Sequence, residues 1–212
     1  MKLFLDTADV KSVKARLSTG LISGITTNPT LIFKSGKHPQ TVYQELIKLG
    51  MDDISMEVMG DSEDELFKNA MGHVKSYGDK ATIKLPCTID GLKACKRLSI
   101  VNVRTNVTLI FSPAQAILAS LAGATYISPF IGRMDDNSLD GMKLINDIKN
   151  TLTTDTKILA ASIRDPQSVG TAFSLGADIC TVPAGVFDRM YNHVLTDKGL
   201  EQFERDNAAT SD

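Results

Sequence analysis

The 212-residue sequence contains no tryptophan, only three cysteines and only three histidines. The cysteines are odd in number and form no CxxC pair, so we expect reduced thiols of a cytoplasmic protein rather than a disulfide scaffold. The histidines lie in unrelated surroundings, without the spacing of metal ligands. This scarcity argues against a dedicated metal site and against a histidine-based catalytic triad.

Excess charge and long apolar runs are also lacking. Lys and Arg number 23 against 25 Asp and Glu, which gives a net charge of −2 and no electrostatic basis for binding nucleic acid or an anionic membrane. No apolar run approaches the roughly 20 residues of a membrane-spanning helix. An acid stands already at Asp6, too early for the apolar core of a signal peptide. The sequence therefore predicts neither a nucleic-acid partner nor a membrane partner.

What the sequence does contain is a regular alternation of short strand-like runs and amphipathic helical segments. We expect strands at 2–6, 24–29, 54–59, 82–85, 103–109, 125–128, 157–161 and 178–182. We expect helices at 9–17, 41–49, 62–77, 91–98, 113–121, 139–151, 166–175 and 185–195. Strict alternation of this kind implies right-handed βαβ units and a parallel sheet.

Near-equal units favour a closed sheet, so the predicted fold is α/β, a single-domain (β/α)8 TIM barrel over residues 1–195. The structural competitor is an open doubly wound sheet, but no GxGxxG follows the first strand. Residues 196–212 form a predicted C-terminal helical tail, in which Leu200 and Phe203 share one helical face.

The period-2 pattern of the strands predicts which side chains point into the barrel. One parity is mostly aliphatic and is assigned to the helix-facing side: Leu3, Leu5, Ile25, Thr27, Ile54, Met56, Val58, Ile83, Leu85, Val103, Val107, Leu109, Ile127, Leu159 and Ala161. The other parity then points inward: Phe4, Asp6, Gly24, Thr26, Asn28, Ser55, Glu57, Thr82, Lys84, Asn106, Thr108, Ser128, Phe130, Ser162 and Arg164. Polar residues thus converge at the C-terminal ends of the strands, where barrel enzymes place their active sites.

Lys84 is the most unusual of these residues, because it stands near the end of a buried, β-branched run. It either extends its ammonium group to solvent from the strand end or serves as an amine nucleophile that forms a Schiff base with a carbonyl substrate. Opposing carboxylates stabilise an ammonium group. We therefore expect Asp6 and Glu57 to act as proton-transfer groups held some way from the amine.

Five segments together resemble the transaldolase family, in particular its small subfamily, which also contains fructose-6-phosphate aldolases. They are Gly24-Ile25-Thr26-Thr27-Asn28-Pro29 with Leu31, Ile83-Lys84-Leu85-Pro86-Cys87-Thr88, Asn106-Val107-Thr108-Leu109-Ile110-Phe111-Ser112, Ile127-Ser128-Pro129-Phe130-Ile131-Gly132-Arg133 and Ala161-Ser162-Ile163-Arg164. The resemblance extends from Asp6 to about Phe187.

The resemblance implies a role for each candidate residue. Lys84 would be the Schiff-base nucleophile, Asp6 the acid/base at the hydroxyl beside the breaking bond, and Glu57 with Thr108 would position a water for the carbinolamine steps. Asn28, Asn106 and Ser128 would hold the hydroxyls of a dihydroxyacetone unit, and Thr26 would shape the pocket. Arg133, Ser162 and Arg164 would bind the sugar phosphate. No cofactor is implied.

Two positions distinguish the subfamilies: the aldolases have glutamine where Glu57 stands and tyrosine where Phe130 stands. The implied activity is therefore transfer of dihydroxyacetone between sugar phosphates in the pentose phosphate pathway. A fructose-6-phosphate aldolase is the alternative. A sugar-phosphate-binding barrel without turnover needs neither Lys84 nor Asp6, and a metal-dependent aldolase is disfavoured by the histidine placement.

The resemblance also implies a homo-oligomer, often a decamer of two pentamers, in which the C-terminal helix reaches a neighbouring subunit. A short amphipathic helix that folds onto its own barrel fits the Leu200/Phe203 face equally well.

Overall fold

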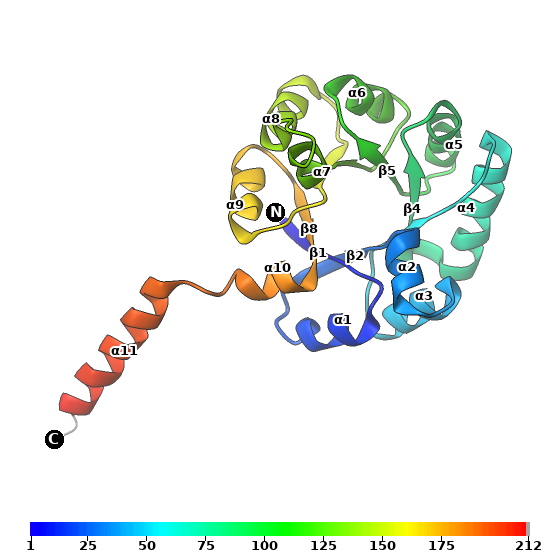
Figure 1. Cartoon of the computed structure of the whole chain (residues 1–212). Helices are drawn as coiled ribbons and strands as arrows, with labels where there is room; N and C mark the ends of the chain where they lie inside the picture. Colours follow the sequence, from blue (N-terminus) through cyan, green and yellow to red (C-terminus); the bar gives the residue numbers. More distant parts are fainter. Residues whose placement is uncertain (211–212) are drawn as a thin grey trace.

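A computed structural model describes residues 1–210, and its centre is a closed barrel of eight parallel strands in chain order (Figure 1). The strands are β1 (Lys2–Asp6), β2 (Ile22–Thr26), β3 (Ile54–Glu57), β4 (Ala81–Pro86), β5 (Thr105–Ile110), β6 (Tyr126–Pro129), β7 (Lys157–Ala160) and β8 (Ile179–Val182). Pairing of β1 with β8 closes the barrel. The predicted (β/α)8 barrel is confirmed, and the open doubly wound sheet is excluded.

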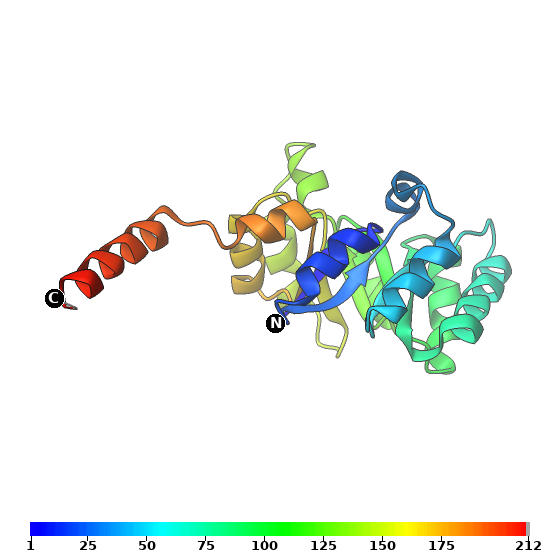
Figure 2. The same ribbon diagram turned by 90° about the horizontal axis from the view of Figure 1, so that it is seen from below.

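Helices α1 to α10 surround the barrel, and α11 extends away from it (Figures 1 and 2). They are α1 (Val10–Leu17), α2 (Pro29–Ser35), α3 (Pro39–Lys48), α4 (Glu63–Tyr77), α5 (Ile89–Ile100), α6 (Pro113–Leu121), α7 (Ile131–Asp135), α8 (Gly141–Thr151), α9 (Pro166–Ser174), α10 (Ala184–Arg189) and α11 (Val194–Ala209), with a 3-10 turn at Gly78–Lys80. No helix within residues 1–210 combines the length and apolarity that crossing a membrane requires.

Side-chain caps define where most of these helices begin. Asp9 accepts a hydrogen bond from the Lys11 backbone N–H at 3.0 Å, and Ser112 accepts one from Gln115 at 3.2 Å. Such caps satisfy N–H groups that have no partner within the helix. They stabilise the first turn of each helix and so set its starting residue.

Two short helices, α2 and α7, were not predicted, because seven and five residues are too few to show a helical period. The predicted strand at 24–29 lies too far along the chain: β2 begins at Ile22 and ends at Thr26, and α2 begins at Pro29. Asn28 caps α2 by accepting a hydrogen bond from Leu31 N at 2.9 Å. The predicted helix at 185–195 is likewise two elements, α10 and the start of α11.

The helix-facing side of the barrel is aliphatic, as predicted for most strands. Ile25, Ile54, Ile83, Val107 and Ile127 are all fully buried in the core between strands and helices. A second, smaller apolar cluster fills the barrel itself, and its members are Phe4, Tyr126, Leu159, Ala161 and Ile179. Side chains of one parity therefore point inward and those of the other parity outward.

The predicted parity is wrong for β7. Leu159 and Ala161 belong to the interior cluster, whereas Ile158 and Ala160 join the helix-facing core. Both faces of β7 are apolar, so the sequence pattern does not indicate which face points into the barrel. Ser162 follows with a left-handed φ of +60°, which reverses the alternation, and this residue lines a cavity at the C-terminal end of the barrel.

The prediction also fails at Leu109, which was assigned to the helix-facing side. Leu109 has a left-handed φ of +61°, and the pairing of β5 with β6 shifts register between Val107 and Ile110. As a result Leu109 lines the cavity beside Lys84, and Ile110 takes the buried helix-facing position. Bulges of this kind re-aim side chains and are frequent beside active sites.

The N-terminal end of the barrel holds its own polar network around the buried Asp53. This carboxylate accepts hydrogen bonds from Thr82 Oγ1 at 2.7 Å and from the Tyr126 hydroxyl at 2.7 Å, and it pairs with Arg104 at 3.1 Å. Beside it, a Cβ on Gly24 would lie 2.5 Å from the Phe4 ring, so this position must be glycine for the ring to fit. A buried carboxylate is tolerated because three donors satisfy it.

Helix α11 projects away from the barrel (Figures 1 and 2), and none of its residues is buried. Leu200 and Phe203 are exposed by 55% and 70%, so this face does not fold back onto its own barrel. The helix begins at Val194, so the expected boundary between residues 195 and 196 falls inside it. The last two residues of the predicted tail, 211 and 212, lie outside the described residues.

Candidate active site

Two adjoining cavities of about 120 and 330 Å³ open at the C-terminal end of the barrel. They share four lining residues: Asn28, Lys84, Phe130 and Arg133. The smaller cavity adds Asp6, Thr26, Ser128, Ala161, Ser162 and Thr181, and the larger adds Pro29, Thr30, Leu31, Glu57, Thr108 and Leu109. The predicted residues Asp6, Thr26, Asn28, Glu57, Lys84, Thr108, Ser128, Phe130, Arg133 and Ser162 therefore meet around one amine.

The Lys84 side chain rises from β4 into the barrel and is only 6% exposed. Its Nζ donates a hydrogen bond to the Thr27 backbone carbonyl at 3.0 Å and lies 3.2 Å from Glu57 Oε2. The expectation that Glu57 stands away from the amine is therefore wrong, because Glu57↔Lys84 are register partners on neighbouring strands and share one parity. A buried ammonium group requires such a partner. The alternative in which Lys84 reaches solvent is excluded.

Asp6 lies on the other side of the cavity and makes no ion pair with Lys84 among the described residues. Its Oδ1 accepts a hydrogen bond from Thr26 Oγ1 at 2.7 Å. Burial raises the pKa of Asp6 above its ordinary value, while the Thr26 hydrogen bond and the Lys84 charge oppose this shift. A carboxyl group with a raised pKa is suited to exchanging protons.

A hydrogen-bonded chain of neutral side chains lies inside the barrel beneath the two cavities. Asn106 Nδ2 donates to Ser55 Oγ at 3.1 Å, and Ser128 Oγ donates to Asn106 Oδ1 at 2.7 Å. Asn106 is fully buried and does not line either cavity, whereas Ser128 does. Asn106 is thus in contact with the site through Ser128.

Thr108 Oγ1 is buried and makes no hydrogen bond within residues 1–210, although Thr108 lines the larger cavity. Leaving a buried hydroxyl without a partner costs about 1–3 kcal/mol. The left-handed conformation of the next residue, Leu109, adds strain of a similar size. Strain and an unsatisfied polar group next to a charged amine are typical of a binding site.

Of the three residues expected to bind phosphate, two line the cavities and one does not. Arg133 on α7 lines both cavities, with its guanidinium 4.8 Å from the centre of the Phe130 ring. Ser162 lines the smaller cavity. Arg164 lines neither: its guanidinium forms a two-pronged ion pair with Asp136, one contact being 2.8 Å from Nη1 to Oδ1.

Among the polar side chains that line the smaller cavity, one was missed in the sequence, namely Thr181 on β8. The pattern at 179–182 alternates Ile, Cys, Thr and Val, and only Ile179 and Thr181 point inward. Alternation of side chains along the eighth strand, applied as for the other strands, predicts that Thr181 is its polar inward-facing residue. Thr181 Oγ1 lies 2.6 Å from Thr26 Oγ1.

Across the described part of the chain, no group of three or more His, Cys, Asp or Glu side chains is arranged to hold a metal ion. The chemistry available at this site is that of one amine between two carboxyl groups, with several hydroxyls and amides and one arginine at the mouth.

The sequence is similar to known proteins over its whole length. The family model Transaldolase/Fructose-6-phosphate aldolase matches residues 3–212. The chain is 47% identical to a probable transaldolase of Caulobacter vibrioides, with 99% of this chain and 98% of that protein covered. It is 46% identical to a probable transaldolase of Nitrosopumilus maritimus, with 97% and 94% covered.

Among solved structures, the fold is similar to a thiamine phosphate pyrophosphorylase from Pyrococcus furiosus. The TM-score is 0.57 at 16% sequence identity, and 85% of each chain is covered. At this identity the likeness concerns the barrel alone.

Proposed function

The chain belongs to the transaldolase/fructose-6-phosphate aldolase family, and on this premise we propose that it is a transaldolase acting through a Schiff base at Lys84. The observation that carries the proposal is the placement of one buried amine between two carboxyl groups. Glu57 lies on one side of the amine and Asp6 on the other, each in its own cavity. Schiff-base chemistry and carbon–carbon cleavage each need a proton-transfer group, and these are two such groups.

The reaction begins at the carbonyl carbon of a ketose phosphate, such as fructose 6-phosphate or sedoheptulose 7-phosphate. Glu57 accepts the ammonium proton of Lys84, and the free amine attacks C2 to give a carbinolamine. Protonation of the carbinolamine hydroxyl releases water and leaves an iminium ion. Thr108, whose hydroxyl has no protein partner, holds this water together with Glu57.

Cleavage takes place on the Asp6 side. The Asp6 carboxylate takes the proton of the C4 hydroxyl, the C3–C4 bond breaks, and its electron pair enters the iminium to form an enamine. The aldose phosphate leaves, and an acceptor such as glyceraldehyde 3-phosphate or erythrose 4-phosphate takes its place. The enamine attacks the acceptor aldehyde, and Asp6 returns its proton to the new hydroxyl. Water then hydrolyses the iminium and restores Lys84.

The remaining residues hold the substrate. Asn28 and Ser128 contact the hydroxyls of the three-carbon unit, and Asn106 acts through Ser128. Thr26 orients Asp6. Arg133 and Ser162 bind the phosphate, and Arg164 joins them when it leaves Asp136. Sugar phosphates are therefore the proposed partners.

The choice of transaldolase over fructose-6-phosphate aldolase rests on Phe130. Its ring lines both cavities beside Lys84 and carries no hydroxyl that could protonate the enamine carbon. An enamine that is not protonated persists until an acceptor arrives, which is what a transferase requires. The aldolase remains the second candidate, since it uses the same amine.

A coupled assay tests the proposal. The protein is incubated with fructose 6-phosphate, with and without erythrose 4-phosphate, and both glyceraldehyde 3-phosphate and free dihydroxyacetone are followed. Acceptor-dependent glyceraldehyde 3-phosphate without free dihydroxyacetone is expected. Release of both products without acceptor would identify an aldolase.

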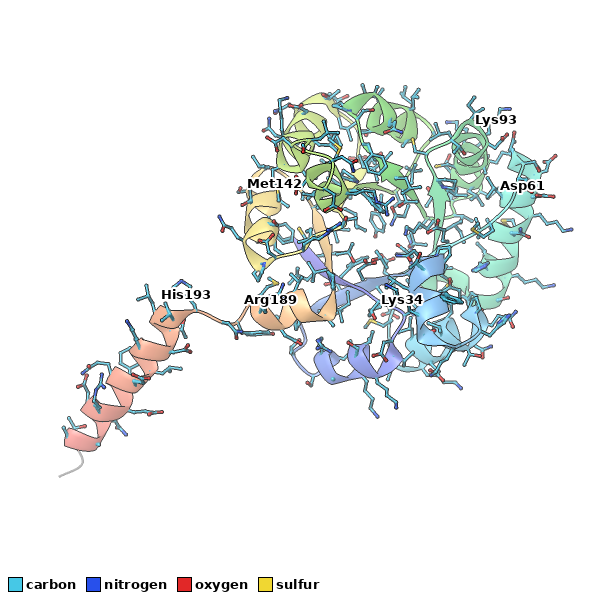
Figure 3. All side chains as sticks on the ribbon, viewed as in Figure 1. Lys34, Asp61, Lys93, Met142, Arg189 and His193 are labelled. Carbon is cyan, nitrogen blue, oxygen red and sulfur yellow. The ribbon has the colours of Figure 1, made fainter. Side chains whose placement is uncertain are left out.

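Borohydride trapping tests the nucleophile. Reduction in the presence of fructose 6-phosphate is expected to attach the substrate covalently at Lys84, and Lys84→Arg is expected to abolish the adduct. Lys93→Arg is the matched control, because Lys93 lies on the outer side of α5 (Figure 3) and is 58% exposed. An adduct that survives in the Lys84→Arg variant would refute the assignment.

We also propose that the protein is a cytoplasmic homo-oligomer, with a decamer of two pentamers as the expected form. The apolar side chains of α11 support assembly because they are exposed on a single chain: Val194, Leu195, Leu200 and Phe203. The three free cysteines support the location. Light scattering compares the mass of the assembly formed by the full chain with that of a Leu200→Asp/Phe203→Asp variant. An unchanged mass would contradict assembly through α11.

A further inference from the structure

Thr181 on β8 has no part in the mechanism above, yet its hydroxyl is linked to the Asp6 carboxyl group through the hydroxyl of Thr26. Thr181 Oγ1 is 2.6 Å from Thr26 Oγ1, which in turn is 2.7 Å from Asp6 Oδ1. Both threonines are buried, and all three residues line the smaller cavity together with Lys84.

The direction of this hydrogen-bonded chain follows from the number of protons. An ionised carboxylate only accepts, and a hydroxyl group has one proton to donate. Thr26 gives its proton to Asp6, so at the 2.6 Å contact Thr26 must accept and Thr181 must donate. Thr181 thereby fixes the rotation of the Thr26 hydroxyl with its proton toward Asp6.

The strand order explains why these groups meet. Strands β2 and β8 flank β1 on its two sides, with Thr26 paired to Asp6 and Thr181 paired to Phe4. The two hydroxyls therefore approach each other inside the barrel from opposite sides of β1. The hydrogen bond from Thr26 is made to Asp6 Oδ1, and within residues 1–210 no side-chain hydrogen bond is made to Oδ2.

We propose that Thr181 is a positioning residue for the transaldolase reaction: through Thr26 it orients the Asp6 carboxylate and stabilises its ionised form, which is the base. This inference rests on the proposed role of Asp6. Thr181 does not contact Asp6 directly and is connected to it only through the hydroxyl of Thr26.

The surroundings of Asp6 show why such support matters. The charged groups that face it are Lys84 from β4 and Arg133 from α7. The other facing groups, from β2, β6 and β8, are the neutral hydroxyls of Thr26, Ser128 and Thr181. Burial raises the pKa of Asp6, and hydrogen bonds to the carboxylate counteract that shift.

Removal of the Thr181 hydroxyl is expected to move the acid limb of the pH profile upward. Hydrogen bonds to an ionised group are about twice as strong as neutral ones, and each bond in a chain strengthens the next. Loss of the terminal donor therefore weakens the ionised form of Asp6 more than the protonated form. A net hydrogen bond is comparable to one pKa unit, so a shift of about 0.5 to 1 unit is expected.

The test compares Thr181→Val, which keeps the shape and removes the hydroxyl, with Thr181→Ser, which restores it. The control Thr105→Val makes the same chemical change at a fully buried threonine whose hydroxyl faces Cys95 and not the cavity. The pH dependence of kcat/KM, the separate values of kcat and KM, and circular dichroism are measured for each full-length variant.

For Thr181→Val we expect the acid limb of the pH profile to move to higher pH. At pH values below the apparent pKa of the base, kcat should fall about three- to tenfold at nearly constant KM. Thr181→Ser should restore the profile, and Thr105→Val should match the unmodified protein. An unchanged pH profile in Thr181→Val would overturn the proposal, and so would a higher KM at constant kcat, which would mean direct substrate contact.

If Thr181→Val does not fold, Thr181→Ala removes the same hydroxyl without added bulk and is subject to the same criteria. Borohydride trapping separates this inference from the proposed function. If the unmodified protein forms no adduct at Lys84, the proposed function fails. If the adduct forms in all variants while their pH profiles are identical, only the role of Thr181 is refuted.

Discussion

The ion pair between Arg164 and Asp136 leads to a prediction about substrate affinity. Asp136 lies just after α7, and Arg164 follows β7, so the pair joins two segments at the mouth of the barrel. A phosphate that binds Arg164 must compete with the Asp136 carboxylate for the same guanidinium fork. Asp136→Asn removes this competitor, and we expect a lower KM for phosphorylated substrates.

The magnitude follows from exposure. The side chains of Arg164 and Asp136 are 56% and 48% exposed, and pairs of this kind contribute about 0.2–1 kcal/mol. One kcal/mol corresponds to about a fivefold change in a binding constant. KM should therefore fall by up to about fivefold at low ionic strength, and the difference should shrink in high salt because exposed charges are screened.

The assay is steady-state turnover of fructose 6-phosphate with erythrose 4-phosphate, at two salt concentrations. Asp155→Asn is the matched control, because it makes the same charge change at an exposed residue beside the cavity at the opposite end of the barrel. Arg164→Ala is made with and without Asp136→Asn, and this cycle isolates the pair.

Four outcomes would refute the reasoning. KM could be the same in Asp136→Asn and the unmodified protein, or fall equally in Asp155→Asn. The effect of Asp136→Asn could persist in the Arg164→Ala background. A higher KM would show that Asp136 holds Arg164 in place for the phosphate rather than competing with it.

Three further predictions concern other parts of the barrel. Tyr126→Phe removes a hydrogen bond to the Asp53 carboxylate and should cost about 2 kcal/mol, or about 5 °C in Tm, without changing kcat. Phe130→Tyr introduces a proton donor beside the enamine and should raise the release of free dihydroxyacetone in the coupled assay. Gly132→Ala places a Cβ 2.2 Å from the Ser162 carbonyl oxygen, so it should destabilise the protein by about 1–3 kcal/mol and raise KM for phosphorylated substrates.

Two of these predictions have a matched control variant, and the third has a refuting outcome. Tyr191→Phe, at a 56% exposed tyrosine, should leave Tm unchanged, and equal shifts at both tyrosines would contradict the role of Asp53. Constant dihydroxyacetone release in Phe130→Tyr would count against the account of Phe130. Gly170→Ala adds a Cβ with no atom within 4 Å, so only Gly132→Ala should lose stability in urea unfolding.

Much of the barrel was predictable, because polar and apolar residues alternate cleanly on most strands. Asp6, Thr26, Glu57 and Lys84 were assigned to the interior by parity alone, and all of them line the two cavities. Parallel strands bring residues of equal parity to the same end, so their convergence required no knowledge of tertiary contacts.

The failures have physical causes. Leu109 and Ser162 adopt left-handed φ values, which no propensity for leucine or serine indicates, and each reverses the alternation that the prediction relied on. The contact between Glu57 and Lys84 depends on the register of β3 against β4, which a single sequence does not specify. The Arg164–Asp136 pair joins segments 28 positions apart, beyond the reach of any local pattern.

The network around Asp53 has a consequence for how this protein can change. Among the described residues, no side-chain hydrogen bond connects Asp53, Thr82, Tyr126 and Arg104 to the residues that line the two cavities. Substitutions at sites that share no partners have nearly additive effects. Laboratory evolution of new acceptor specificity usually consumes stability, and proteins tolerate this only above a threshold. Stabilising substitutions around the N-terminal end of the barrel would therefore raise the free energy of unfolding. Residues at the catalytic end could then be substituted without bringing the protein below the stability threshold.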